Sequence, residues 1–444
     1  MNEINQKQKL PEGWKWVNGG TDIFLIPGTR PFGGATDEGI PSLGGEHITM
    51  DGRVRFNETN AKFVPFKFYN SIDRGKAKIN DILINKDGAN TGKVAILRKM
   101  FAPYIMVNEH VFIVRSKSFF DQNFLFYYLF SHYGQNQIKS KITGSAQPGL
   151  SSSFIKSFYL LFPTLSEQQK IAEILETVDN AREKTDAIIE KYKRIKKGLM
   201  QELLTKGIDE NGKIRDEKTH RFKDSPLGRI PEEWEVKRLG EVISQIETGT
   251  WGDEIHTNYN NVFPIIRSTE IDEEGRFDLS TVAYRSLPYK KAIKYILNIG
   301  DILLVASSGS PDLIGRAAII KSIPKDIKLL FSNFMLCIRS KNNIIISKFL
   351  FYILRSSLYC SFLSSFRETT TGLINFPKSE FENFEIPLPP LPEQQRIAEI
   401  LSQIDEVIEK ETQYRDKLKR LKAGLMEDLL TGKVRVNKLI KQGA

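Results

Sequence analysis

Two short segments contain residue types that could do chemistry. The first is DGANTGK at 87–93, which partly matches the loop that holds nucleotide phosphates with glycine backbone and a lysine. That loop requires a glycine where this chain has Asp87, and the matching segment of the second half, which ends in Gly315-Arg316, has a different spacing. A β-turn between two strands explains both segments, so we expect no nucleotide site here.

The second segment contains Asp224, Glu235 and Lys237. These residues could form a nuclease site, with two carboxylates for a divalent ion and a lysine that stabilises charge. The pattern is short, and the first half of the chain has Lys15-Trp16-Val17 at the matching place. We therefore favour a solvated strand edge for Glu235 and its acidic neighbours. A metal-dependent DNA endonuclease stays open as an alternative function.

The sequence contains no other catalytic motif. It lacks the Asn-Pro-Pro-aromatic and Asp-Pro-Pro-Tyr tetrapeptides of amino-methyltransferases, the glycine fingerprint of dinucleotide-binding proteins and the Gly-x-Ser-x-Gly nucleophile elbow. Its five histidines do not occur at helical ligand spacing, so we expect no histidine-built metal site. The chain is therefore expected to bind rather than to catalyse, without a metal or cofactor of its own.

Length and charge point to several domains and an anionic partner. A chain of 444 residues is too long for one ordinary domain, and a hydrophobic content of 40% supplies enough material for real cores. Lys plus Arg exceed Asp plus Glu by 64 − 54 = 10, which favours nucleic acid as a partner. Two cysteines, no signal peptide and no stretch of about 20 apolar residues predict a cytoplasmic protein that contacts no membrane.

The chain repeats itself. Residues 166–205 and 392–431 align without a gap at an offset of 226, and 21 of these 40 positions are identical. The segments before them also correspond: LPEGW at 10–14 matches IPEEW at 230–234, and each half continues with a DIL strand, an aromatic helix and a polar loop. One ancestral segment was duplicated, and the order is module, helix, linker, module, helix.

Each repeat reads as a long helix with a heptad pattern, which predicts coiled-coil pairing of the two helices, most economically antiparallel. Thr185 and Glu411 interrupt the pattern at matching positions, and Gly207 and Gly432 follow the helix ends. The coiled-coil residues that we expect in the first helix are Ile171, Ile174, Val178, Ile188, Tyr192, Ile195 and Leu199. Those in the second are Ile397, Ile400, Ile404, Val407, Tyr414, Leu418, Leu421 and Leu425.

The predicted fold class is α+β. Two similar α/β modules are separated by two long antiparallel coiled-coil helices with pseudo-twofold symmetry. The expected boundaries are module 1 at 1–163, a central helical repeat at 164–207, a polar linker at 208–229, module 2 at 230–389, a C-terminal helical repeat at 390–432 and a basic tail at 433–444.

Polar and basic residues on loops are the candidates for nucleic-acid contacts. Residues 1–160 carry 20 basic and 13 acidic side chains, and residues 230–388 carry 18 and 19, so module 1 should supply more of the salt-dependent affinity. The loops 143–153 and 367–377 rank highest because they occupy the same place in both halves. The candidates are Arg53, Arg55, Lys86, Asn90, Lys93, Lys139, Lys141, Ser145, Gln147, Arg267, Ser307, Ser308, Arg316, Arg367, Thr369, Thr370 and Thr371, with Lys290, Lys291 and Lys294 as further basic residues of module 2.

The two copies of EQQxIAEIL, each ending in GLMxxLLT and each preceded by a variable module, resemble the specificity subunit of type I restriction–modification systems. The resemblance covers nearly the whole chain. It implies two target-recognition domains that each read one half of a bipartite, asymmetric double-stranded DNA target, and two helices that set the gap between the halves. It also implies a subunit without catalytic activity.

The resemblance further implies partners: two methylation subunits and two restriction subunits, which would carry S-adenosylmethionine, ATP and Mg. It places Glu167, Gln168 and Gln169 on one helix, and Glu393, Gln394 and Gln395 on the other, on outward faces that meet the methylation subunits. A two-headed scaffold that binds any polyanion stays open as a second alternative.

Overall fold

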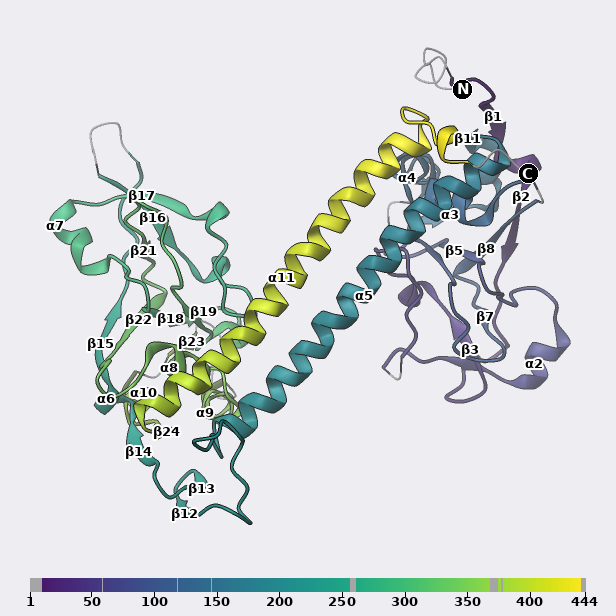
Figure 1. The fold of residues 1–444 in the computed structure, drawn as a ribbon. Coiled ribbons are helices and arrows are strands. Elements are labelled where there is room, and N and C mark those ends of the chain that lie inside the picture. The colour runs from purple at the N-terminus through teal and green to yellow at the C-terminus, as the bar shows by residue number, and fades with distance from the viewer. Residues whose placement is uncertain are drawn as a thin grey trace. The chain divides into compact units, whose positions relative to one another are not determined.

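The computed structural model describes residues 10–57, 59–117, 119–144, 146–255, 261–367, 374–376 and 378–440. These residues form two compact units: residues up to 186 with those from 413 onward, and residues 187–412. The division falls in the middle of both long helices, α5 (Leu165–Leu203) and α11 (Leu391–Leu430) (Figure 1). Each unit therefore contains one module, half of α5 and half of α11.

Module 1 is built on a four-stranded antiparallel sheet of order β2-β8-β5-β6. Its strands are β2 (Ile23–Pro27), β8 (Val111–Ser116), β5 (Ile82–Asn85) and β6 (Val94–Ile96). A smaller mixed sheet contains β4 (Phe63–Val64), β3 (Ile40–Leu43) and β7 (Met106–Val107), with β3 and β7 parallel. The remaining strands are β1 (Lys15–Asn18), which pairs with β11 (Tyr159–Phe162), and the hairpin of β9 (Ile142–Thr143) and β10 (Gly149–Leu150).

The helices of module 1 include α1 (Gly19–Asp22), α2 (Phe66–Ser71), α3 (Gln122–Phe130) and α4 (His132–Lys139), with 3-10 turns η2 (Gly45–His47) and η3 (Ser152–Ser157). Helix α3 is the predicted aromatic helix, and six of its consecutive residues, 124–129, are buried. They pack in one core with strands β5 and β8 and with residues of α5 such as Ile171 and Leu175. The module is thus fastened to the first half of α5 by its own hydrophobic core.

Module 2 repeats the large and the small sheet of module 1. Its large sheet has the order β15-β22-β18-β20, with β15 (Ile243–Thr248), β22 (Met335–Ser340), β18 (Ile302–Val305) and β20 (Ala317–Ile319). Its small sheet contains β17 (Ala283–Ser286), β16 (Val262–Ile266) and β21 (Leu330–Phe331). The other pairs are β14 (Glu235–Arg238) with β24 (Glu385–Leu388) and β19 (Ser307–Ser308) with β23 (Ile374–Asn375). These equivalences confirm the predicted α+β class and the duplication.

The helices of module 2 are α6 (Leu239–Val242), α7 (Tyr289–Ala292), α8 (Ser347–Ile353), α9 (Ser357–Arg367) and α10 (Lys378–Asn383). Its 3-10 turns are η4 (Ser268–Glu270), η5 (Leu279–Thr281), η6 (Ile293–Tyr295) and η7 (Pro311–Leu313), and η8 (Asn437–Leu439) follows α11. The second predicted aromatic helix corresponds to α8, whose residues 349–353 are buried.

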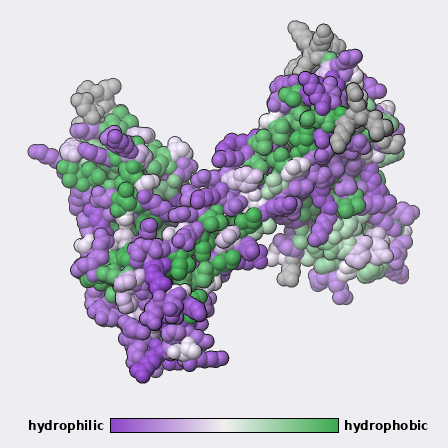
Figure 2. All heavy atoms as spheres, viewed as in Figure 1, coloured by the Kyte–Doolittle hydropathy of each residue, from purple (hydrophilic) through white to green (hydrophobic). Residues whose placement is uncertain are grey.

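The segment between α5 and module 2 contains a hairpin of β12 (Phe222–Ser225) and β13 (Gly228–Pro231). Figure 2 shows mainly hydrophilic residues on this hairpin, at the bottom of the view, as its composition predicts. The start of the segment is different, because Ile208 is only 3% exposed and belongs to the core of module 2. The segment is therefore a packed connection at its beginning and a surface hairpin further on.

Helices α5 and α11 carry the predicted heptad pattern, but half of the expected residues are one position out of register. Ile195 and Leu421 are 39% and 51% exposed, whereas the neighbouring Lys196 and Lys422 are 6% and 5% exposed. Each heptad contributes two expected contact residues, and the same shift applies to the second of them throughout. The more buried residues at these positions are Leu175, Ile189, Leu401, Ile408 and Arg415, in place of Ile174, Ile188, Ile400, Val407 and Tyr414. The first expected contact residue of each heptad does lie on the paired face. Of these residues Ile171, Val178, Ile397 and Leu418 are buried, and Tyr192, Leu199, Ile404 and Leu425 are half-buried.

Candidate nucleic-acid interface

The segment 86–93 is a turn between strands β5 and β6, and no helix follows it. Gly88 and Gly92 have φ values of 77° and 87°, and the Thr91 hydroxyl donates to the Gly88 carbonyl at 2.6 Å. The Asn90 amide donates to the Gly45 carbonyl at 3.3 Å. A strand–turn–strand geometry lacks the helix N-terminus on which a phosphate loop depends. This confirms the β-turn interpretation.

The β9–β10 hairpin lies directly against this turn. The Gly88 amide donates to the Pro148 carbonyl at 3.0 Å, and the Leu150 amide donates to the Lys86 carbonyl at 2.6 Å. The structure therefore brings together two segments that the sequence nominated separately. Within them Lys141 and Gln147 are exposed and Lys93 is half-buried, and Lys139 is exposed at the end of α4 just before the hairpin. Ser145 lies outside the described residues.

A third segment, loop 28–34, joins the same edge of the module. The Thr29 amide donates to the Val107 carbonyl at 3.1 Å, and Arg30 Nε lies 2.9 Å from Glu109 Oε1. His110 continues the chain of contacts, with Nε2 3.1 Å from Glu109 Oε1 and Nδ1 2.6 Å from Asp87 Oδ1. We call residues 28–34, 86–93, 108–110 and 142–150 the module 1 edge.

Module 2 repeats the backbone contacts of this edge. The Ala306 amide donates to the Phe334 carbonyl at 2.8 Å, as the Lys86 amide does to the His110 carbonyl at 2.9 Å. The Phe376 amide donates to the Ala306 carbonyl at 2.7 Å, as the Leu150 amide does to Lys86. We call residues 249–252, 306–313, 332–334 and 374–376 the module 2 edge. Ser307 and Ser308 belong to it; the Arg367 side chain and Thr369, Thr370 and Thr371 lie outside the described residues.

The two edges carry different side chains on the same backbone. In module 1 the chain of contacts runs through Arg30, Glu109, His110 and Asp87. The residues at these positions in module 2 are Trp251, Asn333, Phe334 and Ser307, none of which is charged. Sequence reasoning missed Arg30, Glu109 and His110 because no motif links three loops that are far apart in the chain.

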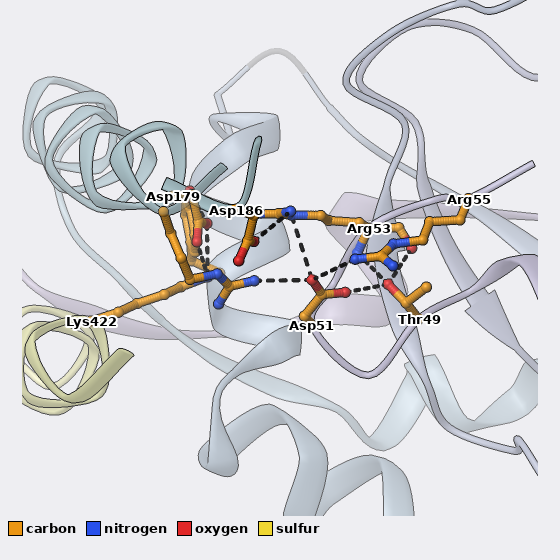
Figure 3. A network of polar contacts seen from close by, with 9 residues as sticks. Thr49, Asp51, Arg53, Arg55, Asp179, Asp186 and Lys422 are labelled. Carbon is orange, nitrogen blue, oxygen red and sulfur yellow. Dashed lines mark hydrogen bonds and ion pairs between the residues drawn. The ribbon is translucent and has the colours of Figure 1, made fainter. Parts of the chain in front are cut away.

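Arg53 lies away from the edge and contacts α5. Its guanidinium lies 3.4 Å from Asp186 and 3.5 Å from Asp51, and Asp51 also accepts from Arg182 at 3.0 Å (Figure 3). Burial alone would raise the pKa of the Asp51 carboxyl, but the hydrogen bond from Thr49 and the nearby arginines lower it. Arg53 therefore holds its turn to the helix, whereas Arg55 remains 63% exposed at a cleft of about 480 Å³.

The basic candidates of module 2 divide in the same way. Arg267 forms an ion pair with the buried Glu270 and donates to the Thr281 carbonyl, and Arg316 donates to the Ile271 carbonyl at 3.5 Å. Both arginines therefore shape their own loops. The exposed Lys290, Lys291 and Lys294 instead line a cleft of about 390 Å³ beside Thr250 and Asp253, and Lys294 also pairs with Glu247 at 2.8 Å.

Gln168 and Gln394 do not face outward as expected. Both are 0% exposed, because each amide spans the junction between helix and module. The amide of Asp121 donates to Gln168 at 2.8 Å, and the amide of Ile346 donates to Gln394 at 2.9 Å. Each glutamine also donates to a carbonyl just before its helix, Pro163 or Pro389. Their neighbours Gln169 and Gln395 are exposed, as predicted.

Two glutamates that were also expected to face outward, Glu167 and Glu393, are buried instead and complete these junctions. Glu393 is 8% exposed and accepts from the indole of Trp234 at 3.0 Å and from the Ile208 amide at 2.8 Å, and it forms an ion pair with Arg215. Gly207, with a φ of 64°, passes close to these groups, where a Cβ would lie 2.4 Å from the Trp234 ring. The sequence identified Gly207 as a helix stop, and the structure adds that a close approach also requires it.

The equivalent junction of unit 1 joins the two ends of the chain. Glu167 accepts from the Trp14 indole at 3.2 Å and from Arg435 at 2.7 Å. Arg435 also donates to the Glu12 carbonyl at 3.0 Å. Gly432 takes the place of Gly207, since a Cβ there would lie 2.6 Å from Pro11. The segment after α11 thus packs beside the start of module 1.

The proposed nuclease residues do not form a site. Asp224 lies on β12 with a 97% exposed side chain and is 3.8 Å from Arg229, while Glu235 lies on β14 and pairs with Lys237 at 3.4 Å. In the described part of the chain, no group of three or more His, Cys, Asp or Glu side chains could hold a metal ion. Among the same residues, no helix has the length and apolar character needed to cross a bilayer.

Comparison with known proteins is consistent with this geometry. The family model for the type I restriction modification DNA specificity domain matches residues 55–194 and 231–420, more than half of the chain. The MjaVIII specificity subunit of Methanocaldococcus jannaschii is 30% identical over 438 residues, which cover 97% of this chain and 95% of that protein. The StySPI specificity subunit of Salmonella potsdam is 25% identical, covering 90% and 83%.

The fold matches as well. The crystal structure of the S subunit of a type I restriction–modification system from M. genitalium aligns over 95% of this chain and 98% of that one, with a TM-score of 0.62 at 15% identity. Its likeness concerns the fold alone. Each of the two family-model matches covers residues of one module and part of the long helix that follows it. The chain belongs to the family of DNA specificity subunits of type I restriction–modification systems.

Proposed function

We propose that the chain reads a bipartite, asymmetric double-stranded DNA target, with one half-site bound by each edge. The observation that carries this proposal is the pair of edges, which share their backbone hydrogen bonds and differ in their side chains. Constant backbone contacts would place both edges against DNA in the same way, while different side chains would select different bases. Since one chain supplies both edges, the target need not be palindromic.

The proposal includes the partners. The relatives are named as subunits of restriction enzymes, which supports assembly of this chain with two methylation and two restriction subunits. S-adenosylmethionine, ATP and Mg would then be bound by those partners. Apolar side chains that α5 and α11 expose off their paired faces, including Ile188, Ile195, Tyr414 and Leu421, would supply part of the contact surface.

Exchange of module 1 tests the proposal. The chain is expressed with its methylation subunit, and the methylated sites of the genome are mapped before and after residues 1–160 are replaced by the corresponding part of another specificity subunit. One half-site should change and the other should stay. A change in both half-sites, or in neither, would contradict the proposal.

A finer variant exchanges only side chains of the edge. Replacing Asn90, Lys93 and Gln147 while keeping Gly88 and Gly92 should relax base preference in the module 1 half-site, because the turn geometry is retained. The matched control replaces Lys15, which is exposed on strand β1 of the same module and lies off the edge. Equal binding to all polyanions, without preference for one DNA sequence, would instead favour a general polyanion scaffold.

A further inference from the structure

The tip of loop 28–34 carries an apolar side chain that the protein itself does not cover. Phe32 has a relative exposure of 110%, the highest among the large apolar side chains of the described residues, where Met50 follows at 76%. Burying a phenylalanine side chain removes a large apolar surface from water, which favours association. An aromatic ring at a loop tip is therefore a strong source of free energy for any partner that covers it.

The base of the loop is fixed, so the position of the ring is defined. The backbone of Gly28 lies so close to the carbonyl of Asn108 that a Cβ would be 2.0 Å from it. Arg30 is paired with Glu109, and Pro31 has a restricted φ. The Gly34 amide donates to the Pro31 carbonyl at 3.2 Å and closes a turn around Phe32.

The residues after the ring leave room for a large partner. Gly33 and Gly34 have φ values of 92° and 93°, which favour glycine. No heavy atom lies within 4 Å of where their Cβ atoms would be. A bulky surface can therefore approach the ring without meeting other side chains of this turn.

The surroundings of the ring are polar and charged rather than apolar, and Arg30 and His110 are paired there with Glu109 and Asp87. Arg30 is 61% exposed and His110 is 47% exposed, and Lys86 and Lys93 lie on the adjoining turn. The core of a protein–protein interface is depleted of charged residues, whereas charged side chains adjoin Phe32. Double-stranded DNA matches both features, because its phosphates face the cations and its stacked bases offer an apolar interior.

We propose that Phe32 inserts as a wedge between neighbouring base pairs of the half-site bound by module 1 and partly unstacks them. This inference rests on the proposed function. Such wedges kink DNA at the inserted step and add selectivity for sequences that deform easily. In module 2 the aromatic residue at the corresponding loop, Trp251, is covered by the guanidinium of Arg285 at 4.5 Å, so the distortion is assigned to one half-site.

The test uses the complex of the full chain with its methylation subunits and DNA that carries 2-aminopurine at successive positions of the mapped target. With the unchanged protein, fluorescence should rise at one step of the module 1 half-site. Phe32→Ala should abolish this rise and weaken specific binding about tenfold, with an unchanged dependence on salt because no phosphate contact is lost. Phe32→Leu, which keeps an apolar wedge, should retain most of both.

Phe24→Ala is the matched control. Phe24 is 54% exposed in the same module but lies on strand β2 beside Lys117, and its replacement should change neither binding nor fluorescence. An unchanged 2-aminopurine signal with Phe32→Ala would overturn the wedge, as would loss of assembly with the methylation subunits instead of loss of DNA binding. If the unchanged complex prefers no DNA sequence, the proposed function itself fails, which is a different outcome.

Discussion

The ammonium group of Lys422 lies 2.7 Å from both carboxylate oxygens of Asp179 (Figure 3). Lys422 is on α11 and Asp179 is on α5, so this ion pair joins the two helices inside unit 1. The hydroxyl of Tyr127 donates to Asp179 at 2.9 Å and connects the pair to the aromatic helix α3. Three elements of the unit thus meet at one carboxylate.

Unit 2 contains the same arrangement with the roles of the helices exchanged. Lys196 on α5 lies 2.5 Å from Asp405 on α11, and the Tyr352 hydroxyl donates to Asp405 at 2.8 Å. Asp405 follows Asp179 by the repeat offset of 226 residues, and Lys422 follows Lys196 by the same offset. The duplication therefore preserved a charged contact between helices as well as an apolar one.

Replacing Asp179 with asparagine should destabilise unit 1 by about 3–5 kcal/mol, because a buried ammonium would lose its counter-charge. Burial lowers the pKa of Lys422 and Asp179 opposes that effect, so the pKa of Lys422 should fall further in the variant. Urea unfolding of the full chain, followed by circular dichroism, measures the change in free energy.

The matched control for this prediction is the double variant Asp179→Leu with Lys422→Met. It removes both charges and fills the space, so its cost should be much smaller than that of the single variant. A single variant that lost less than about 1 kcal/mol would show that the pair is not buried in solution.

These lysines also explain how far the sequence could predict the helices. The sequence predicts the heptad spacing, the helix ends and the duplication, because these features depend on residue identity and on the spacing of apolar residues. The spacing of apolar residues predicts the paired face one residue off at every second position. It favours Ile195 and Leu421, whereas Lys196 and Lys422 are the buried residues. Nothing in the sequence alone shows that a lysine has a partly buried aspartate as its partner.

The candidate site was predictable in part for a similar reason. The turn 86–93 and the hairpin 142–150 stood out as polar loops, and the structure places them together. The family resemblance predicts Gln168 and Gln394 on outward faces, but both side chains are buried. Their burial depends on backbone groups of the module that only the tertiary fold brings to them.

A circular permutant should fold and assemble with its partners. The segment after α11 packs beside the start of module 1 through Arg435, Glu12 and Pro11, as the segment after α5 packs beside the start of module 2. New ends opened at the exposed turn between β12 and β13 would cut no core contact. Near-unchanged melting temperature and an unchanged methylated sequence are expected.

A permutant opened inside α3 is the control for that experiment and should fail to fold, because residues 124–129 of this helix are buried. If the permutant opened between β12 and β13 also failed, the contact between the chain ends would not be the equivalent of the α5 connection.

Acid should weaken module 1 through His47. Its Nδ1 accepts from the Gly44 amide and its Nε2 donates to the Asn60 carbonyl, both at 2.8 Å, so the ring is neutral. Burial lowers the pKa of His47 below its ordinary value of about 6.5, although the bond to Asn60 opposes this. Above pH 6.5 the ring is neutral in both folded and unfolded chains, and its contribution to stability is complete.

As the pH falls below about 6.5, the unfolded chain takes up a proton first and the free energy of unfolding decreases, until the folded ring is protonated as well. Melting temperatures between pH 7.5 and 5 should therefore fall more steeply for the unchanged protein than for His47→Gln. Equal slopes in the two proteins would rule out His47 as the source.

Lengthening both long helices by one heptad should lengthen the gap in the DNA target. Helices α5 and α11 run without a break through residues 186–187 and 412–413, where the two units divide. Seven residues inserted at both places preserve the paired face and add about 10 Å of helix, close to three base pairs. Methylation mapping should find both half-sites unchanged and the gap longer by about three base pairs.

The control inserts four residues in α5 alone, which turns the paired face away from α11 and should reduce assembly instead. An unchanged gap in a folded, active double insertion would show that the helices do not set the spacing.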